Sequence, residues 1–458
     1  MRDTNFLTEN NAKHVWHPMA HPGEMRRTPP HIVEEGEGVE IVDLHGHRLL
    51  DGVGGLWNVN LGYSCEPVKA AMIAQLQKLP YYNAFRGTTN SPLIELSYEL
   101  CRFFKPEGMT RAFLTSGGSD SVETCLRLAR QYHRANGQPE RTKFFALKKG
   151  YHGTHFGGAS VNGNPNFRRN YEPMLAGVHH LPAPFTYRNP FETEDGAVIA
   201  RKIAAQFEED IAFQGADTIA ALIMEPVLGS GGVIVPHESF FPLMRAICDR
   251  HGILLIADEV ITGFGRAGCE SGSRLWGIQP DMMSTAKGIS NGYFPLGAAM
   301  ISEKLAGTIE DAKGALGTIS HGYTYSGHPV GAAAALATLS EIKRLTVAEN
   351  AARQGVRLLD GLLRLKDKYE IVGDARGKGL MAALELVSDR RTKTPADKTS
   401  VQALFDAAYA AGVMIRTSGN NIIISPCLVI DDGHVDRILA ALDAGLAAAT
   451  AVLERPGY

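Results

Sequence analysis

The sequence has little cysteine. Its six cysteines are scattered over 458 residues, and no two of them form a C-x-x-C pair. In a chain of this size, that usage argues against a disulfide framework and against a cysteine-rich zinc site. It indicates reduced thiols, and we therefore expect a cytoplasmic protein.

Long apolar runs and an excess of charge are also missing. No uninterrupted apolar stretch approaches the roughly 20 residues of a membrane span, and residues 1–19 lack the apolar core of a signal peptide. The formal net charge of −3 provides no basic field for nucleic acid or an anionic membrane. Three histidines near the start, His14, His17 and His21, lack a carboxylate or thiol partner at ligand spacing, so we expect no metal site.

What is present is an ordinary globular composition, 44% hydrophobic and 21% charged, with length for two or three domains. Between about residues 111 and 325, short apolar runs alternate with amphipathic stretches. Residues 218–227 and 253–260 read as buried strands, and residues 238–252 between them read as a helix. This order and spacing predict an α/β fold, with a mostly parallel sheet covered by helices on both faces.

A further strand and helix are expected around a glycine turn, where Asp120 and Glu123 make a plausible N-terminal cap for the helix. The alternation of short apolar runs and amphipathic stretches ends at about Pro329, where we expect a long alanine-rich helix to begin. We expect three parts: an N-terminal segment of short strands that packs with the small domain, a large domain, and a small α+β domain. Their expected ranges are residues 1–60, 61–325 and 326–458.

One motif raises an alternative function. Residues 252–268 read GILLIADEVITGFGRAG, and GFGRAG matches the G-x-G-x-x-G fingerprint of a dinucleotide-binding turn. That fingerprint requires a helix directly after the glycines and an acid about 20 residues further on. Residues 269–281 show no helical apolar stripe, and the acids Asp258 and Glu259 precede the glycines. A glycine connection behind a buried strand is therefore favoured over a nicotinamide dehydrogenase.

Asp258 then needs another explanation, because the carboxyl end of a buried strand in such a sheet is where ligands bind. Lys287 follows it along the chain among small residues, in MMSTAKGIS. A lysine in an apolar pocket loses its proton readily and becomes a nucleophile for carbonyls. Such a lysine paired with a strand-end aspartate is typical of pyridoxal phosphate enzymes, whereas a lone lysine is usually a surface residue.

A phosphate group would need a site of its own. In TSGGSD, Gly117, Gly118 and Ser119 offer backbone N–H groups at the start of an amphipathic helix. Gly-Gly-Ser turns are common, so this turn indicates a phosphate site only in combination with Lys287 and Asp258. Tyr151 in KKGYHGT could lie flat on a pyridine ring, and in isolation it reads equally well as a core tyrosine.

Several motifs now point to one family. They are DGVGGLWNVNLGY, TSGGSDSVET, YHGT, IMEPVLGSGGVIVP, LIADEVITGFGRAG, PDMMSTAKGISNGYFPLGA and HGYTYSGHPVGAAAA. With them, over nearly its whole length, the chain resembles the class III pyridoxal-phosphate-dependent aminotransferases, in particular the omega-aminotransferase branch. The resemblance implies fold type I and a homodimer with active sites at the subunit interface, and it leaves open whether dimers pair into tetramers.

The resemblance also implies roles for individual residues. Lys287 would hold the cofactor as a Schiff base, and Asp258 would bond its pyridine nitrogen. Gly117, Gly118 and Ser119 would bind the phosphate, and Tyr151 and Val260 would contact the two faces of the ring. Glu225 would lie near the cofactor at the rim of the site, and Thr324 would reach the phosphate from the neighbouring subunit. The chain departs from the family at two positions. It has Gly117 where the family usually has serine, which removes a hydroxyl contact, and Asp120 where the family often has glutamate.

Substrate residues follow from the same resemblance. Trp57 and Phe85, with Met19, would form an apolar wall for amines that lack a carboxylate near the reacting carbon. Arg416 would clamp the carboxylate of a keto acid acceptor such as pyruvate, a bidentate contact that lysine makes poorly. We expect ping-pong transamination. A decarboxylase, aminomutase or epimerase on the same fold remains the alternative, and a non-catalytic relative would normally have lost the lysine.

Overall fold

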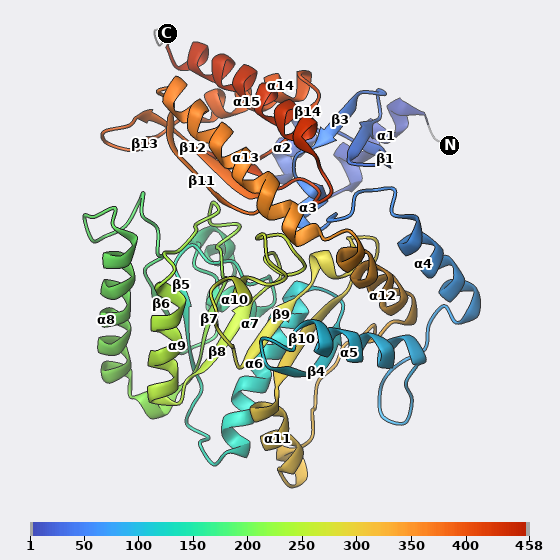
Figure 1. Ribbon diagram of the computed structural model, residues 1–458, viewed down its shortest axis with the longest axis vertical. Helices are drawn as coiled ribbons and strands as arrows, with labels where there is room; N and C mark the ends of the chain where they lie inside the picture. The colour runs from blue at the N-terminus through green and yellow to red at the C-terminus, as the bar shows by residue number, and fades with distance from the viewer. Residues whose placement is uncertain (1–2, 455–458) are drawn as a thin grey trace.

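The computed structural model describes residues 3–454, and its centre is a seven-stranded sheet with the order β4-β10-β9-β8-β7-β5-β6 (Figure 1). β10 runs antiparallel to its two neighbours, and the other adjacent pairs are parallel. The strand bounds are β4 Met109–Thr115, β5 Lys143–Leu147, β6 Val178–Leu181, β7 Ile219–Met224, β8 Leu254–Asp258, β9 Met282–Thr285 and β10 Gly297–Ser302.

Helices cover both faces of this sheet, as the sequence predicts. Every residue of β7 and β8 is buried. Because side chains alternate along a strand, Leu254 and Ile256 pack in the same cluster as α6, whereas Leu255 packs with α8 and α9. The helices around this sheet are α6 Gly118–Ala135, α7 Phe156–Val161, α8 Gly196–Gln214, α9 Phe240–His251, α10 Gly272–Leu275 and α11 Glu303–Asp311, with the short 3-10 helices η1 Pro165–Phe167, η2 Arg169–Tyr171, η3 Ala216–Thr218, η4 Lys287–Ser290 and η5 Gly314–Leu316.

The predicted cap of α6 is wrong. The helix begins at Gly118, and its N-cap is Gly117, which makes no side-chain cap. Asp120 therefore lies inside the first turn, where its carboxylate accepts hydrogen bonds from the backbone N–H of Ser116 at 3.0 Å and from His155 Nε2 at 2.6 Å. The start of the helix is consequently made of small residues that face the pocket described below.

A second body is built from two smaller sheets. The antiparallel sheet has the order β11-β12-β16-β15, and β13 pairs with β12. A four-stranded sheet, β1-β2-β3-β14, joins N-terminal and C-terminal strands, because Leu50 and Asp51 of β3 pair in parallel with Val413 and Met414 of β14 (Figure 1). The strand bounds are β1 Val33–Glu37, β2 Glu40–Asp43, β3 Arg48–Asp51, β11 Val372–Lys378, β12 Met381–Asp389, β13 Thr394–Pro395, β14 Val413–Met414, β15 Arg416–Ser418 and β16 Asn421–Ile424.

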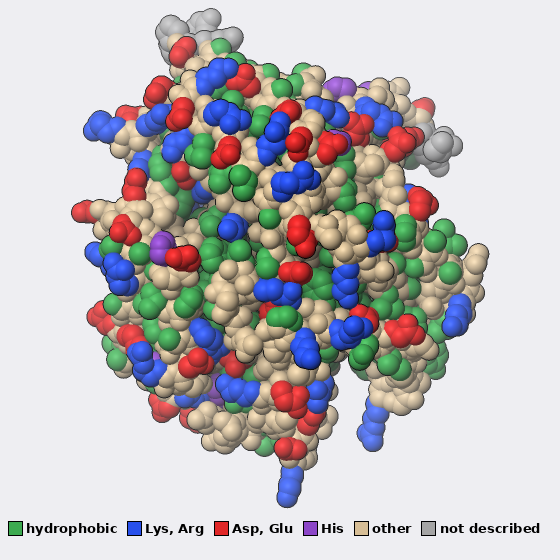
Figure 2. All heavy atoms as spheres, viewed as in Figure 1, with side chains coloured by type: hydrophobic (Ala, Val, Ile, Leu, Met, Phe, Trp, Pro, Cys, Tyr) green, Lys and Arg blue, Asp and Glu red, His purple; other side chains and the backbone are tan. Residues whose placement is uncertain are grey.

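The remaining helices surround these sheets or connect the two bodies. α12 leaves the large sheet and packs against α4 and α5, at the flank of the molecule (Figure 1). The bounds are α1 Thr4–His14, α2 Pro22–Arg27, α3 Gly54–Trp57, α4 Glu66–Lys78, α5 Ser91–Phe103, α12 Pro329–Arg344, α13 Val347–Lys368, α14 Lys398–Ala410 and α15 Asp432–Leu453. Within residues 3–454, no helix has the length and apolar character needed to cross a membrane. Figure 2 shows acidic and basic side chains mixed over one face of the molecule.

The GFGRAG segment joins the two bodies. Arg266 is fully buried, and its guanidinium donates to the carbonyls of Leu380 and Pro426 and to Asn60 Oδ1. Gly268 abuts Ala352 of α13, where a Cβ would lie 3.1 Å from the Ala352 Cα. The glycines therefore belong to a tightly packed joint, and the helix that follows them, α10, has only 4 residues, which agrees with the rejection of a dinucleotide turn.

Candidate active site

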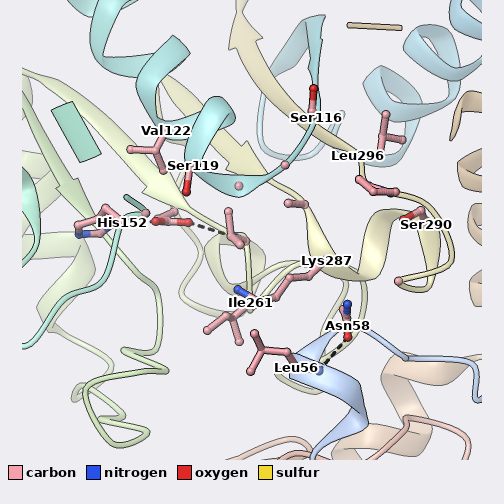
Figure 3. A pocket seen from close by; sticks show the side chains of 18 of the residues that line it. Leu56, Asn58, Ser116, Ser119, Val122, His152, Ile261, Lys287, Ser290 and Leu296 are labelled. Atoms are coloured by element: carbon pink, nitrogen blue, oxygen red, sulfur yellow. Dashed lines mark hydrogen bonds and ion pairs between the residues drawn. The ribbon is translucent and has the colours of Figure 1, made fainter. Parts of the chain in front are cut away.

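A cavity of about 410 Å³ opens at the carboxyl ends of the parallel strands (Figure 3). Asp258 ends β8, Lys287 follows β9, Glu225 follows β7, and Gly118 follows the turn after β4. All four line the cavity, as do Gly117, Ser119, Tyr151 and Val260. Because parallel strands end at one edge of the sheet, the predicted residues from distant segments meet at one place.

Lys287 lies at the centre of the cavity. In Figure 3 it lies between Ser119 on one side and Leu56 and Ile261 on the other. Burial lowers the pKa of Lys287 to about 8, against the opposing pull of the Asp258 carboxylate. Its backbone has a φ of 47°, a left-handed conformation that a side chain rarely adopts. An amine with this pKa is partly neutral near pH 7 to 8, so it can act as a nucleophile and exchange a proton.

The carboxylate of Asp258 is held in a fixed orientation. Its Oδ1 accepts hydrogen bonds from Ser284 Oγ at 3.0 Å and from the Val260 N–H at 3.1 Å, and its Oδ2 lies 2.7 Å from His152 Nδ1. Asp258 is 3% exposed. The buried aspartate is therefore held on one side by a hydroxyl and a backbone N–H and on the other by the imidazole of His152.

His152 is a site residue that the sequence analysis missed. It is 1% exposed and lines the cavity directly after Tyr151. Its partner Asp258 is 106 positions away, so no local spacing connects the two. The available signal was the YHGT motif itself, in which only the tyrosine received a role.

Glu225 lies under the cavity with both oxygens occupied. Oε1 accepts the backbone N–H of Tyr151 and Oε2 that of Gly229, each at 2.9 Å. Burial raises the pKa of Glu225 to about 7, and the negative charge of Asp258 acts in the same direction. Glu225 thus ties the segment that carries Tyr151 to the loop after β7.

The raised pKa of Glu225 predicts a pH-dependent stability. Between its ordinary pKa of 4.5 and about 7, folded Glu225 binds more protons than it does in the unfolded chain. Stability therefore falls as pH rises through that range, by up to about 3 kcal/mol. Glutamine does not titrate, so Glu225→Gln lacks this contribution to the pH dependence of the free energy of unfolding. Urea unfolding of the cofactor-free protein at pH 5 and pH 8 should give a smaller pH difference for the variant, and equal differences would contradict the assignment.

The start of α6 fits an anionic group. At Gly118 a Cβ would stand 2.9 Å from Val260 Cγ1, so the close approach of the two segments requires glycine. Ser119 Oγ accepts the Thr154 N–H at 3.1 Å. Backbone N–H groups and the helix dipole favour a phosphate here. At Gly117 the backbone is extended, and no atom of the described residues lies within 4 Å of where a Cβ would stand, so the site has room for the family's serine.

Tyr151 and Val260 both line the cavity, and the Tyr151 ring packs edge-on against Phe167 at 5.0 Å. Arg416 begins β15 in the second body. Its positive charge acts to lower the pKa of both Lys287 and Tyr151, although Arg416 is not among the described residues that line the cavity. Burial lowers the pKa of Arg416 itself.

Other predicted residues are not brought into the cavity of the single chain. Trp57 is 2% exposed and packs with Val227, Val233 and Ile261, while its neighbour Leu56 lines the cavity. Trp57 therefore stands behind the wall that Ile261 forms.

Three more predicted residues lie on exposed segments. Phe85 is 51% and Met19 63% exposed. Thr324 is also exposed, and its carbonyl accepts Tyr81 Oη at 2.7 Å. None of the three is among the described residues that line the cavity.

The donor set fits pyridoxal phosphate. A partly neutral buried amine can bind an aldehyde, a fixed carboxylate can pair with a protonated pyridine nitrogen, and a helix N-terminus can hold a phosphate. The close approach of Gly118 and Val260 leaves a cavity floor without a side chain at the helix start. The fold and the site together define a pyridoxal-phosphate-dependent enzyme of fold type I.

Comparisons with known proteins narrow the class. The family model Aminotransferase class-III matches residues 23–446. The putrescine–pyruvate aminotransferase of Pseudomonas aeruginosa is 36% identical over 89% of this chain and 88% of its own length. The chain belongs to the class III aminotransferases, and it uses pyridoxal phosphate to transfer amino groups.

Solved structures agree with this family. A pyridoxal-phosphate-bound amine transaminase from an uncultivated Pseudomonas species superimposes with a TM-score of 0.93 at 48% identity, over 95% of this chain and 98% of that one. An (S)-enantioselective omega-transaminase from Thermomicrobium roseum gives a TM-score of 0.94 at 36% identity, over 98% and 99%. The predicted fold class and cofactor are confirmed.

Proposed function

We propose that this aminotransferase takes its amino group from an amine without a carboxylate near the reacting carbon and passes it to pyruvate. The observation that carries the proposal is the asymmetry of the site. Leu56 and Ile261 line the cavity beside Lys287 as apolar side chains, and Arg416 of the second body acts electrostatically on Lys287. The similarity to an amine transaminase and to a putrescine–pyruvate aminotransferase supports the same pairing of substrates.

The residues divide the chemistry among themselves. When bound, the cofactor supplies an electron-withdrawing ring. Lys287 Nζ, with its pKa of about 8, holds and releases the proton that moves during transfer. Asp258 would pair with the protonated ring nitrogen, and His152 and Ser284 fix the aspartate in place. Gly118 and Ser119 would hold the phosphate with the backbone N–H of Gly117, and Tyr151 and Val260 would lie against the ring.

An amine panel tests the substrate proposal. Each amine is supplied with pyruvate, and alanine is measured as the product. Aliphatic and aryl-alkyl amines should yield alanine faster than α-amino acids do. If no amine yields alanine, or if carbon dioxide or a rearranged amine is the product instead, the proposal is wrong and another reaction on this fold takes its place.

Replacing Arg416 should separate the two substrates. A bidentate contact between a guanidinium and a carboxylate stabilises the complex by about 1.5–3 kcal/mol, so Arg416→Ala should raise the KM for pyruvate by at least about tenfold. The KM for an uncharged aldehyde acceptor should change by less than about twofold. Steady-state kinetics with both acceptors measures this, and an unchanged KM for pyruvate would remove Arg416 from the acceptor site.

We also propose that a second copy of the chain completes the cavity. Phe85 and Thr324 lie on exposed segments that are linked by the Tyr81 hydrogen bond. Further exposed apolar side chains lie on α4, on α5 and on the loop between them: Ile73, Leu76, Tyr82, Ile94 and Tyr98. A dimer that covers this surface would bring Phe85 and Thr324 to the partner's site. Light scattering should give the mass of two chains, or of four if dimers associate, and a stable monomer with full activity would contradict the proposal.

The expected division of the chain, with boundaries near residues 60 and 325, is likewise proposed. It is supported by the pairing of β3 with β14 and by the start of α12 at Pro329. All six cysteines are free thiols in the structure, which supports the expected cytoplasmic location.

A further inference from the structure

Arg376 of β11 lies at the boundary between the two bodies and is almost fully enclosed, with 10% of its side chain exposed. Its Nε donates to the carbonyl of Gly232 at 2.7 Å, and its Nη2 donates to Asn421 Oδ1 at 2.6 Å. Nη1 donates to Asp374 at 2.8 Å and to Glu385 at 3.2 Å. One guanidinium therefore binds groups from the loop after β7 and from the small sheet at the same time.

The first of these partners leads to the cavity through the loop after β7. The N–H groups of Gly232 and Val233 both donate to the carbonyl of Gly229. The N–H of Gly229 in turn donates to Glu225, which lines the cavity. Arg376 packs closely against this loop, because a Cβ at position 232 would stand 2.8 Å from Arg376 Nη2. The φ of Gly232, 110°, also favours glycine at this position.

The second partner leads to Arg416. Asn421 begins β16, and in the β15–β16 hairpin it pairs with Ser418 while Arg416 pairs with Ile423. Asn421 Nδ2 also donates to the Ser418 carbonyl at 3.4 Å. The side chain of Asn421 thus connects Arg376 to the short strand on which Arg416 stands.

These contacts form a continuous path from Glu225, which lines the cavity, to the hairpin that carries Arg416. We propose that Arg376 is a positioning residue that fixes the Arg416 hairpin against the Glu225 loop and thereby sets the affinity for acceptors that carry a carboxylate. The inference rests on the proposed role of Arg416 in binding the acceptor. A displacement of about 1 Å in a binding group is enough to change rates by up to about 100-fold, so an arginine that touches no substrate can still control the acceptor.

The charges around Arg376 allow it to be replaced in a folded protein. Arg188 Nε holds the other oxygen of Glu385 at 2.5 Å, and Lys366 Nζ lies 3.8 Å from Asp374. Both carboxylates therefore keep a cationic partner in Arg376→Gln. Arg376→Lys retains the charge, but a lysine has a single ammonium group and cannot reach acceptors on opposite sides of a planar fork.

The test compares two acceptors in the cofactor-loaded enzyme with one amine donor. The variants are Arg376→Gln, Arg376→Lys and Asn421→Ala, the last of which removes only the link to the hairpin. For all three we expect the KM for pyruvate to rise by about tenfold, with the KM for propanal, which has no carboxylate, within about twofold of its original value. As a matched control, Arg390→Gln removes an arginine of the small body that binds carbonyls of residues 366–370, and both KM values should stay unchanged.

Two outcomes would overturn the inference: a folded Arg376→Gln with an unchanged KM for pyruvate, or equal rises for both acceptors. Thermal unfolding and cofactor absorbance report folding, and if Arg376→Gln does not fold, Asn421→Ala decides. Arg416→Ala measured alongside separates this inference from the proposed function. If Arg416→Ala raises the KM for pyruvate and the Arg376 variants do not, only the positioning role fails. If Arg416→Ala has no effect, the acceptor assignment fails first.

The double variant Arg376→Gln/Arg416→Ala tests whether Arg376 acts through Arg416. Because Arg376 is proposed to act through Arg416, its replacement should add nothing to the KM for pyruvate once Arg416 is gone. A further rise in the double variant would show that Arg376 acts on the keto acid by another route, and it would contradict the inference.

Discussion

Lys287→Ala is expected to abolish transamination, with a loss of kcat greater than about 10⁴-fold, and to remove the visible absorbance of covalently bound pyridoxal phosphate. Lys287 Nζ is the amine that the cavity encloses, and burial holds its pKa at about 8. In the proposed mechanism, both covalent attachment of the cofactor and proton transfer need this atom, and no other lysine lines the cavity among the described residues. Absorbance spectra and alanine production after incubation with amine and pyruvate measure the two effects.

A surface lysine provides the control for this result. Lys304 of α11 is 53% exposed and pairs with Asp281 outside the cavity. Lys304→Ala should keep both activity and absorbance. If Lys287→Ala retained turnover and the absorbance band, the assignment of Lys287 as the catalytic amine would be wrong.

Asp258→Asn is expected to lower kcat by about 10³-fold while the protein stays folded. The amide has the shape of the carboxylate and can still accept from Ser284 Oγ and the Val260 N–H. It lacks the negative charge that is proposed to keep the ring nitrogen protonated, so the ring would withdraw electrons less strongly from the substrate carbon. The loss should appear in kcat with both acceptors, because both half-reactions depend on the ring.

The adjacent acid offers a contrasting variant. Glu259 is also fully buried, but its carboxylate binds the N–H groups of Gly272 and Ser273 and the hydroxyls of Thr262 and Ser273. Glu259→Gln should therefore lower the thermal midpoint and leave kcat within about tenfold of its original value. If Asp258→Asn kept more than a tenth of the activity, or if the two variants behaved alike, the distinct role of Asp258 would be refuted.

The sequence was most informative where a residue follows a buried strand. Asp258 and Lys287 could be paired from their chemistry, a strand-end acid and a lysine among small residues, and the structure brings them to one edge of the sheet because β8 and β9 run parallel. The insertion of β10 as an antiparallel strand between β4 and β9 could not be predicted, because it depends on pairings between segments that are far apart in the chain.

Side-chain partners were harder to predict for the same reason. The YHGT motif draws attention to His152, but no spacing along the chain identifies it, among 16 histidines, as the partner of Asp258. The local pattern around Asp120 suggested a helix cap, but the helix starts earlier because the glycine turn can enter it directly. Trp57 was expected at the cavity surface, and the backbone turn at residues 54–57 instead points Leu56 toward the cavity.

The parallel pairing of β3 with β14 has a consequence for how the protein folds during synthesis. Leu50 leaves the ribosome 363 residues before its partner Val413. At about 5–20 residues per second, the N-terminal strands wait roughly 20 to 70 seconds for the strand that completes their sheet. During that time their unpaired edge is open to other nascent chains or chaperones. The large sheet, whose strands all lie between residues 109 and 302, can form in the interval and serve as the surface on which the two ends of the chain finally meet.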